Sequence, residues 1–114
     1  MSPLKRAVKP FLPKPGEGPS ETVQENGWFD CKYIVETEDG QKSVFNMSAK
    51  GDPGYRVTSM LVSECALCLI KDIDSLPGGE GYGGVLTSAS GLGDVLINRL
   101  RNAGISFKGP ILKD

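Results

Sequence analysis

Two short motifs have the spacing of residues that bind cofactors or exchange electrons. Residues 79–84, GEGYGG, match the G-x-G-x-x-G pattern of dinucleotide-binding proteins. That pattern holds a pyrophosphate when a strand precedes the glycines and a helix follows them, because the helix N-terminus then meets the phosphates. Here Ser75-Leu76-Pro77 precedes the glycines and a short strand is predicted after them. We therefore interpret the run as a flexible loop.

The second motif is the C-x-x-C pair of Cys65 and Cys68, within an apolar run. A redox pair needs a helix N-terminus or cationic neighbours to stabilise its thiolate. A zinc site needs four ligands, whereas the chain has three cysteines and no histidine. We expect both cysteines to pack as small apolar side chains, and we expect no metal site. Without histidine, Ser-His-Asp and Cys-His catalysis are also excluded.

The polar segment that most resembles a ligand-binding surface is DPGYRVT, residues 52–58. Asp52 followed by Pro53 is typical of a helix N-cap with proline at the first helical position. Tyr55 and Thr58 then lie one turn apart at the start of a helix, where backbone N–H groups and the helix dipole point outward. The segment is either an ordinary capped helix start or a wall that faces a ligand.

The elements that would position these residues predict an α+β fold in the order β-β-α-β-α-β. Alternating apolar residues and the Asp39-Gly40 turn predict a β-hairpin over residues 28–50. An apolar helix follows at residues 55–72. Val85-Leu86-Thr87, a helix from Ser88 to Gly104, and Ile105-Ser106-Phe107 would then form a short β-α-β unit.

The helix at residues 55–72 is apolar almost all round, which is typical of a helix buried on several sides. One hairpin and one further helix can cover only part of it. We therefore expect the remaining surface to contact protein outside this chain or a second copy.

Composition and charge limit the class of protein. The 13 basic and 14 acidic residues are scattered, which disfavours nucleic acid as a partner. No apolar run is long enough to span a membrane, and the sequence shows no secretory signal, so we expect an intracellular, cytoplasmic protein with reduced thiols. Prolines and glycines predict an arm or linker over residues 1–27, followed by one small α/β domain over residues 28–109.

Several blocks of the sequence resemble the carboxy-terminal part of saccharopine dehydrogenase-like oxidoreductases, and most closely the trans-acting enoyl reductase branch. These blocks are FLPKPGEGPSETVQENGWF, GDPGYRVTSM with the following ECALCL, GGVLTSAS, and GLGDVLINRLRNAGISF. They occur in the same order as in that family, and the resemblance covers residues 11–107.

The resemblance implies a complete enzyme with an amino-terminal Rossmann domain that binds NAD(P). It also implies that Asp52, Gly54, Tyr55 and Thr58 line the cleft near the nicotinamide and the substrate. The Gly-rich fingerprint of that family has no counterpart in these residues, so we expect this chain alone to bind no cofactor. By resemblance only, a small-molecule or lipid-linked substrate belongs to the complete enzyme, and association with lipid droplets, mitochondria or membranes is compatible.

Three interpretations remain open at this point. The chain is the carboxy-terminal portion of an NAD(P)-dependent oxidoreductase, inactive alone and completed by the missing Rossmann half. Alternatively, it is a stand-alone interaction or dimerisation module that uses the apolar helix at residues 55–72. A third interpretation is a small-molecule binder that uses the wall at residues 52–58. The sequence does not identify catalytic residues.

Overall fold

The computed structural model describes residues 14, 16–79 and 81–113. A short helix, α2 (Glu21–Asn26), leads into the hairpin of β1 (Trp28–Glu36) and β2 (Lys42–Lys50). Helix α3 (Arg56–Lys71) and the single-turn 3-10 helix η2 (Ile73–Ser75) follow. Helix α4 (Ser88–Asn102) and strand β3 (Ser106–Lys113) complete the chain. The predicted α+β class is confirmed.

The three strands form one antiparallel sheet in the order β1-β2-β3. The register pairs Phe29 with Ala49 and Glu36 with Lys42, so β1 and β2 are aligned over their full lengths. The hairpin predicted at residues 28–50 is therefore confirmed. Its turn contains Asp39 and Gly40, and Gly40 has the positive φ of +83° expected from the Asp-Gly pair.

The predicted strand at residues 85–87 is wrong. These described residues form no strand, and Val85 is fully exposed. Three residues after two glycines have no neighbouring strand with which to pair, and Thr87 instead serves as the N-cap of α4. The β-α-β unit is consequently absent, because β3 joins β2 in antiparallel orientation.

The two long helices agree closely with the sequence. Helix α3 was expected at residues 55–72 and occupies Arg56–Lys71, although it begins after the turn at residues 53–55 rather than at Pro53. Helix α4 begins with a capping box between Thr87 and Ser90. It ends where Gly104, at φ +98°, allows the Ile105 N–H to donate to the Leu100 carbonyl at 2.9 Å.

The arm predicted over residues 1–27 is only partly within the described residues, because residues 1–13 and Pro15 lie outside them. Within it, Ser20 caps the unexpected helix α2 through the backbone N–H of Val23. The Gly51 N–H donates to the Gly27 carbonyl at 2.6 Å, and the Asp52 N–H donates to the Gln24 carbonyl at 2.8 Å. These hydrogen bonds hold α2 against the segment that connects β2 to α3.

Strand β3 is longer than predicted because it continues through Gly109-Pro110. A Cβ added at Gly109 would lie 2.7 Å from the Val44 carbonyl oxygen, so the close approach of the two strands requires glycine there. The register shifts at the same place, between Val44 and Asn46. In a sequence, a Gly-Pro pair usually predicts the end of a strand. Here the pair lies at a bulge inside β3.

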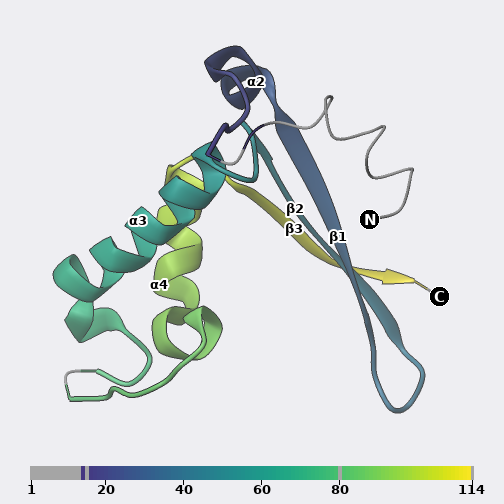
Figure 1. Ribbon diagram of the computed structural model, residues 1–114. Coiled ribbons are helices and arrows are strands. Elements are labelled where there is room, and N and C mark those ends of the chain that lie inside the picture. Colours follow the sequence, from purple (N-terminus) through teal and green to yellow (C-terminus); the bar gives the residue numbers. More distant parts are fainter. Residues whose placement is uncertain (1–13, 15, 80, 114) are drawn as a thin grey trace, which may run out of the picture.

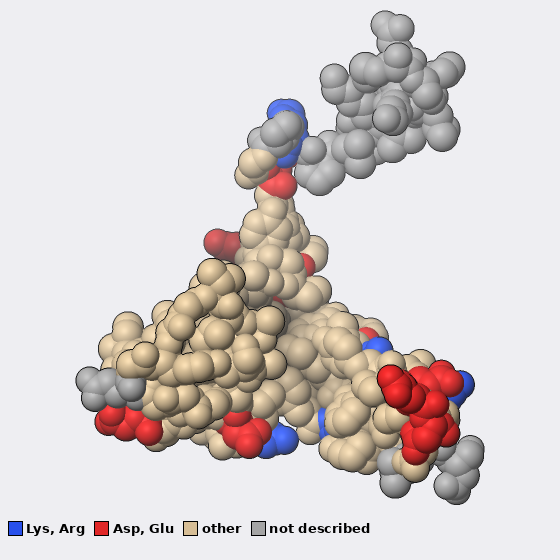
Figure 2. All heavy atoms as spheres, turned by 90° about the horizontal axis from the view of Figure 1, so that it is seen from below, with Lys and Arg blue, Asp and Glu red and all other residues tan. Residues whose placement is uncertain are grey.

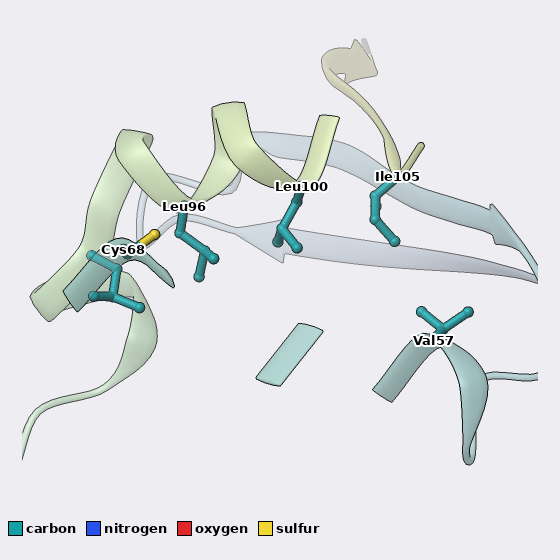
Figure 3. Packing of buried hydrophobic residues seen from close by; sticks show 6 residues of the cluster. Val57, Cys68, Leu96, Leu100 and Ile105 are labelled. Carbon is teal, nitrogen blue, oxygen red and sulfur yellow. The ribbon is translucent and has the colours of Figure 1, made fainter. Parts of the chain in front are cut away.

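The core is small and runs along the contact between α3 and α4, as far as Ile105 just before β3. Leu96 and Leu100 project from α4 toward α3, and Val57 faces Ile105 (Figure 3). The buried apolar side chains are Val57, Cys68, Leu92, Leu96, Leu100 and Ile105. Figure 1 shows the helix pair and the sheet diverging from the end where α3 begins and α4 ends, so that the far part of the hairpin lies away from both helices.

The molecule is more open than a compact domain of its size. Its accessible surface is 9005 Å², whereas a compact monomer of this mass exposes roughly 6,100 Å². Its Cα radius of gyration is 18.8 Å, compared with roughly 13 Å for a compact chain of this length. Within the described elements, several large apolar side chains are uncovered: Trp28 is 73% exposed, Ile34 72% and Ile70 75%.

Candidate functional site

The wall predicted at the start of α3 is a tightly hydrogen-bonded turn. The Tyr55 N–H donates to the Asp52 carboxylate at 2.6 Å. The Thr58 hydroxyl donates to the Pro53 carbonyl, also at 2.6 Å. Two of the four predicted site residues, Asp52 and Thr58, thus use side-chain oxygens to hold the backbone of the same turn. Asp52 acts as a cap, but on the turn that precedes the helix.

Gly54, Tyr55 and Thr58 are exposed, whereas Asp52 is half-buried. Gly54 lies at the corner of the turn, where an added Cβ would be 3.5 Å from the Asp52 carboxylate. The Tyr55 ring is 54% exposed and lies against Gly18 of the amino-terminal arm, where an added Cβ would be 3.3 Å from Tyr55 Cζ. The structure brings the four predicted residues into one turn, and Tyr55 presents the largest surface to a ligand or a partner.

A hollow of about 910 Å³ opens beside this turn, between the start of α3 and the sheet. The four predicted residues do not line it. Helix α3 contributes Arg56, Val57 and Met60 instead, and Lys50 adds a second cation from β2. The wall of the hollow also includes Trp28, Phe29, Asp30, Ser48, Ala49, Ala103, Gly104 and Ser106. Sequence reasoning missed these residues because they come from four separate segments.

Helix α3 has two apolar faces, and the described residues cover only one of them. Val57 and Cys68 are buried on the covered face. The opposite face is exposed, and we call it the α3 stripe: Val62, Ala66, Leu69 and Ile70, continued by Ile73 of η2. Their spacing of three and four residues places these side chains in one row. Figure 2 shows a face of the molecule on which charged side chains gather in a few groups at the margins.

The α3 stripe exposes large side chains that ordinarily lie inside proteins. Ile70 is 75% exposed, Val62 64% and Leu69 57%. Single exposed apolar residues are common, but a contiguous row is typical of a surface that binds another protein or a membrane. No described helix is both long and apolar enough to cross a membrane.

A second apolar surface lies between the helices and the sheet. A groove of about 510 Å³ is lined by Leu61 and Cys65 of α3, by Leu96 and Ile97 of α4, and by Met47 of β2, among others. It opens toward the part of the sheet where Tyr33 and Phe45 are exposed. The sheet therefore continues as an apolar surface beyond the region that the helices cover.

The glycine-rich run at residues 79–84 lacks the context of a dinucleotide-binding turn. It follows the 3-10 helix η2 and Pro77 rather than a strand, and irregular chain separates it from α4. Gly79, Gly83 and Gly84 line a hollow of about 380 Å³ with Leu69 and Ile73 of the α3 stripe. Glu80 lies outside the described residues. The interpretation of this run as a loop is confirmed.

The two cysteines of the C-x-x-C pair belong to the core, as the sequence predicts. Cys68 is completely buried and Cys65 packs against the same cluster. Burial raises the pKa of the Cys68 thiol, because a thiolate would lose its hydration there. In the described part of the chain, no three His, Cys, Asp or Glu side chains are grouped closely enough to hold a metal ion.

Arg99 of α4 forms the main polar contact between the helices. Its Nε donates to Glu64 at 2.7 Å and its Nη1 donates to Asp72 at 2.9 Å. The hydrogen bond to Glu64 is the main cause of a raised Arg99 pKa. The sequence analysis did not identify these two ion pairs of Arg99. A lone acid within the apolar run of α3 is the signal that could have revealed it.

The comparisons with known proteins point to one group of relatives. The chain is 42% identical over 101 residues to Rv2449c of Mycobacterium tuberculosis (strain H37Rv), a protein named provisionally as a trans-acting enoyl reductase. It is 35% identical over 100 residues to a trans-acting enoyl reductase of Mycobacterium ulcerans (strain Agy99). These alignments cover 89% and 88% of this chain, but 23% of each relative.

The chain thus spans about a quarter of the length of the curated relatives it matches. No family model and no solved structure matches it. The chain is therefore similar to one portion of proteins named trans-acting enoyl reductases.

Proposed function

We propose that this chain is the carboxy-terminal portion of a saccharopine dehydrogenase-like, NAD(P)-dependent oxidoreductase that acts as an enoyl reductase. One observation carries the proposal. The chain matches relatives named enoyl reductases over 89% of its own length and 23% of theirs. At the same time, one apolar face of its longest helix, the α3 stripe, is exposed. A piece that folds against a larger body has both properties.

The geometry of α3 supports a division of labour between this chain and a cofactor-binding domain. One face of the helix packs on α4 and the sheet, and the α3 stripe contacts the cofactor-binding domain of the complete enzyme. The turn at residues 52–58 leads into the same helix. Docking of the α3 stripe therefore brings Tyr55 close to the cofactor-binding domain. In this arrangement NAD(P) binds outside the chain, and this portion supplies a wall of the substrate cleft with Asp52, Gly54, Tyr55 and Thr58.

A chimeric enzyme tests this function. This chain replaces the matched segment of full-length Rv2449c, and binding of NADPH is followed by its fluorescence. We expect saturable binding in the chimera and none in the free chain. Oxidation of NADPH in the presence of an enoyl thioester then tests the reaction itself. Saturable NADPH binding by the free chain would contradict the proposed division of labour, as would a folded chimera that binds no NADPH.

A stand-alone interaction module is the second candidate, and the exposed α3 stripe favours it as well. In that case the stripe pairs with a different protein or with a second copy. Tyr55 separates the two candidates, because only an oxidoreductase cleft places its ring beside a substrate. In the chimera, Tyr55→Phe should alter the KM or kcat of NADPH oxidation under the first candidate. The matched variant Tyr82→Phe, in the glycine-rich loop, should alter neither.

A further inference from the structure

The two outer edges of the sheet are built differently. The β3 edge contains Pro110, which has no N–H to donate, and it lies beside the bulge at Val44 and Asn46. Proline and bulges are the usual devices that prevent a strand from pairing with another chain. Strand β1 has neither device over its 9 residues, and its register with β2 is uninterrupted. Among the described residues, no strand pairs with its outer edge.

A second copy of β1 can extend the sheet only in a limited set of registers. Two identical antiparallel strands are related by a two-fold axis perpendicular to the sheet. Each residue must then lie opposite a residue of its own face, because side chains alternate along a strand. The axis therefore passes midway between the two copies of one residue of β1, which lie opposite each other. The choice of that residue fixes every other pair.

The axis through Cys31 gives a self-complementary interface. Asp30 then lies opposite Lys32 of the second copy, and the same pair recurs on the other side of the axis. Phe29 lies opposite Tyr33 of the second copy, and Trp28 lies opposite Ile34. All pairs from residue 28 to residue 34 are thus of opposite charge or both apolar, apart from Cys31 with itself, and such cross-strand pairs stabilise antiparallel sheets.

The neighbouring registers are unfavourable. An axis through Asp30 places the two Asp30 carboxylates opposite each other, and an axis through Lys32 does the same with two ammonium groups. An axis through Tyr33 places Asp30 opposite Glu36 of the second copy. Like charges directly opposite one another destabilise a sheet. An axis nearer either end of β1 leaves a shorter overlap.

The side chains of this edge are available for such pairing. Trp28 is 73% exposed, Ile34 72% and Tyr33 52%. Asp30 accepts a hydrogen bond from the Asn46 amide through one carboxylate oxygen, and its other oxygen can accept from Lys32 of the second copy. Trp28 and Ile34 lie on the sheet face that bears these charges, whereas Phe29 and Tyr33 lie on the face that the helices partly cover.

We propose that two copies of this chain associate through antiparallel pairing of β1 with β1, with Cys31 on the two-fold axis. The product is a continuous six-stranded sheet in the order β3-β2-β1-β1-β2-β3. This inference goes beyond the proposed function, in which the outer edge of β1 has no role. It uses a different surface from the α3 stripe.

Sedimentation equilibrium of the full 114-residue chain under reducing conditions tests the proposal. We expect a monomer–dimer equilibrium whose dissociation constant rises about tenfold or more in Lys32→Asp, because two attractive pairs become repulsive. The matched control is Lys108→Asp, which changes the same charge in the same row of the sheet but on β3. It should leave the dissociation constant unchanged.

Mixing two variants sharpens the test. Asp30→Lys and Lys32→Asp should each associate weakly alone, yet an equimolar mixture should form a mixed dimer, because every charged pair is then of opposite sign. A short bismaleimide should also cross-link the wild-type chain, and Cys31→Ser should abolish this product.

Two results would overturn the proposal. One is a wild-type chain that stays monomeric up to about 1 mM, which would leave no association for β1 to mediate. The other is a dimer that Leu69→Asp dissociates and Lys32→Asp does not, because α3 would then join the copies. Neither result bears on NADPH binding by the chimera, so the proposed function is tested separately.

Discussion

At the scale of single residues, the surroundings of each side chain decide what it does. Cys68, within an apolar stretch of the sequence, is completely buried, whereas Cys31, between Asp30 and Lys32, is exposed. Asp52 and Thr58 look equally available for ligand binding in the sequence, yet both donate or accept within their own turn. Tyr55 is the predicted site residue whose side chain presents the largest exposed surface.

Thiol reactivity checks the different positions of the cysteines. Cys31 should react with a soluble disulfide reagent within the time of mixing, whereas Cys68 should react only as the chain unfolds. Burial raises the pKa of Cys68, so the unfolded chain loses this proton first as the pH rises. The contribution of Cys68 to the free energy of unfolding is therefore present below the ordinary thiol pKa, about 8.5, and declines above it. Equal reaction rates at both cysteines would contradict this assignment.

Two identical substitutions compare the covered and uncovered faces of the helices. Leu96→Ala removes a core side chain that is 8% exposed and should lower the free energy of unfolding by about 2–4 kcal/mol. Leu69→Ala removes a side chain of the α3 stripe that is 57% exposed and should change the free energy of unfolding by less than about 0.5 kcal/mol. Urea denaturation of the free chain measures both values. Comparable losses in the two variants would show that the stripe is covered in solution.

At the scale of elements, local patterns predict most of the fold. Alternation and the Asp39-Gly40 turn predict the hairpin, and apolar periodicity predicts α3 and α4 to within a few residues. The failures occur where neighbours in space override local preference. Val85-Leu86-Thr87 has strand-forming residues but no strand beside it, whereas Gly109-Pro110 continues β3 because β2 lies alongside.

The N-cap of α4 provides a prediction for one element. The Thr87 hydroxyl accepts a hydrogen bond from the Ser90 N–H at 3.1 Å, and the Ser90 hydroxyl accepts one from the Thr87 N–H. Thr87→Ala should lower the free energy of unfolding by about 1 kcal/mol, whereas Thr87→Ser keeps the oxygen and should cost only a few tenths. Thermal denaturation followed by circular dichroism distinguishes the two. Equal melting temperatures for the two variants would show that the Thr87 cap does not contribute to stability.

The candidate site could be predicted only in part, for the same physical reason. The turn at residues 52–58 is local, so its sequence reveals the cap at Asp52 and the helix that follows. The hollow beside it combines Lys50, Arg56 and Trp28 from separate segments, and the contact of Tyr55 with Gly18 depends on how the segment before α2 lies against the turn that precedes α3. Such contacts depend on tertiary packing, which a single sequence does not encode in any local pattern.

At the scale of the whole molecule, the α3 stripe is a surface that the described residues leave uncovered. The helix pair and the sheet diverge from the end where α3 begins (Figure 1), and the side chains of the α3 stripe are exposed. The accessible surface of 9005 Å² is about half as large again as that of a compact monomer of this mass.

The most direct test places one charge in the α3 stripe in two settings. Leu69→Asp should hardly change the melting temperature of the free chain, because Leu69 already faces solvent. In the chimera with Rv2449c it should lower the melting temperature by roughly 5 °C or more, because an unpaired carboxylate would be buried at the contact. Val85→Asp, at a fully exposed site, is the control for both proteins. A change that is equally small in the free chain and the chimera would contradict the claim that the stripe docks on the cofactor-binding domain.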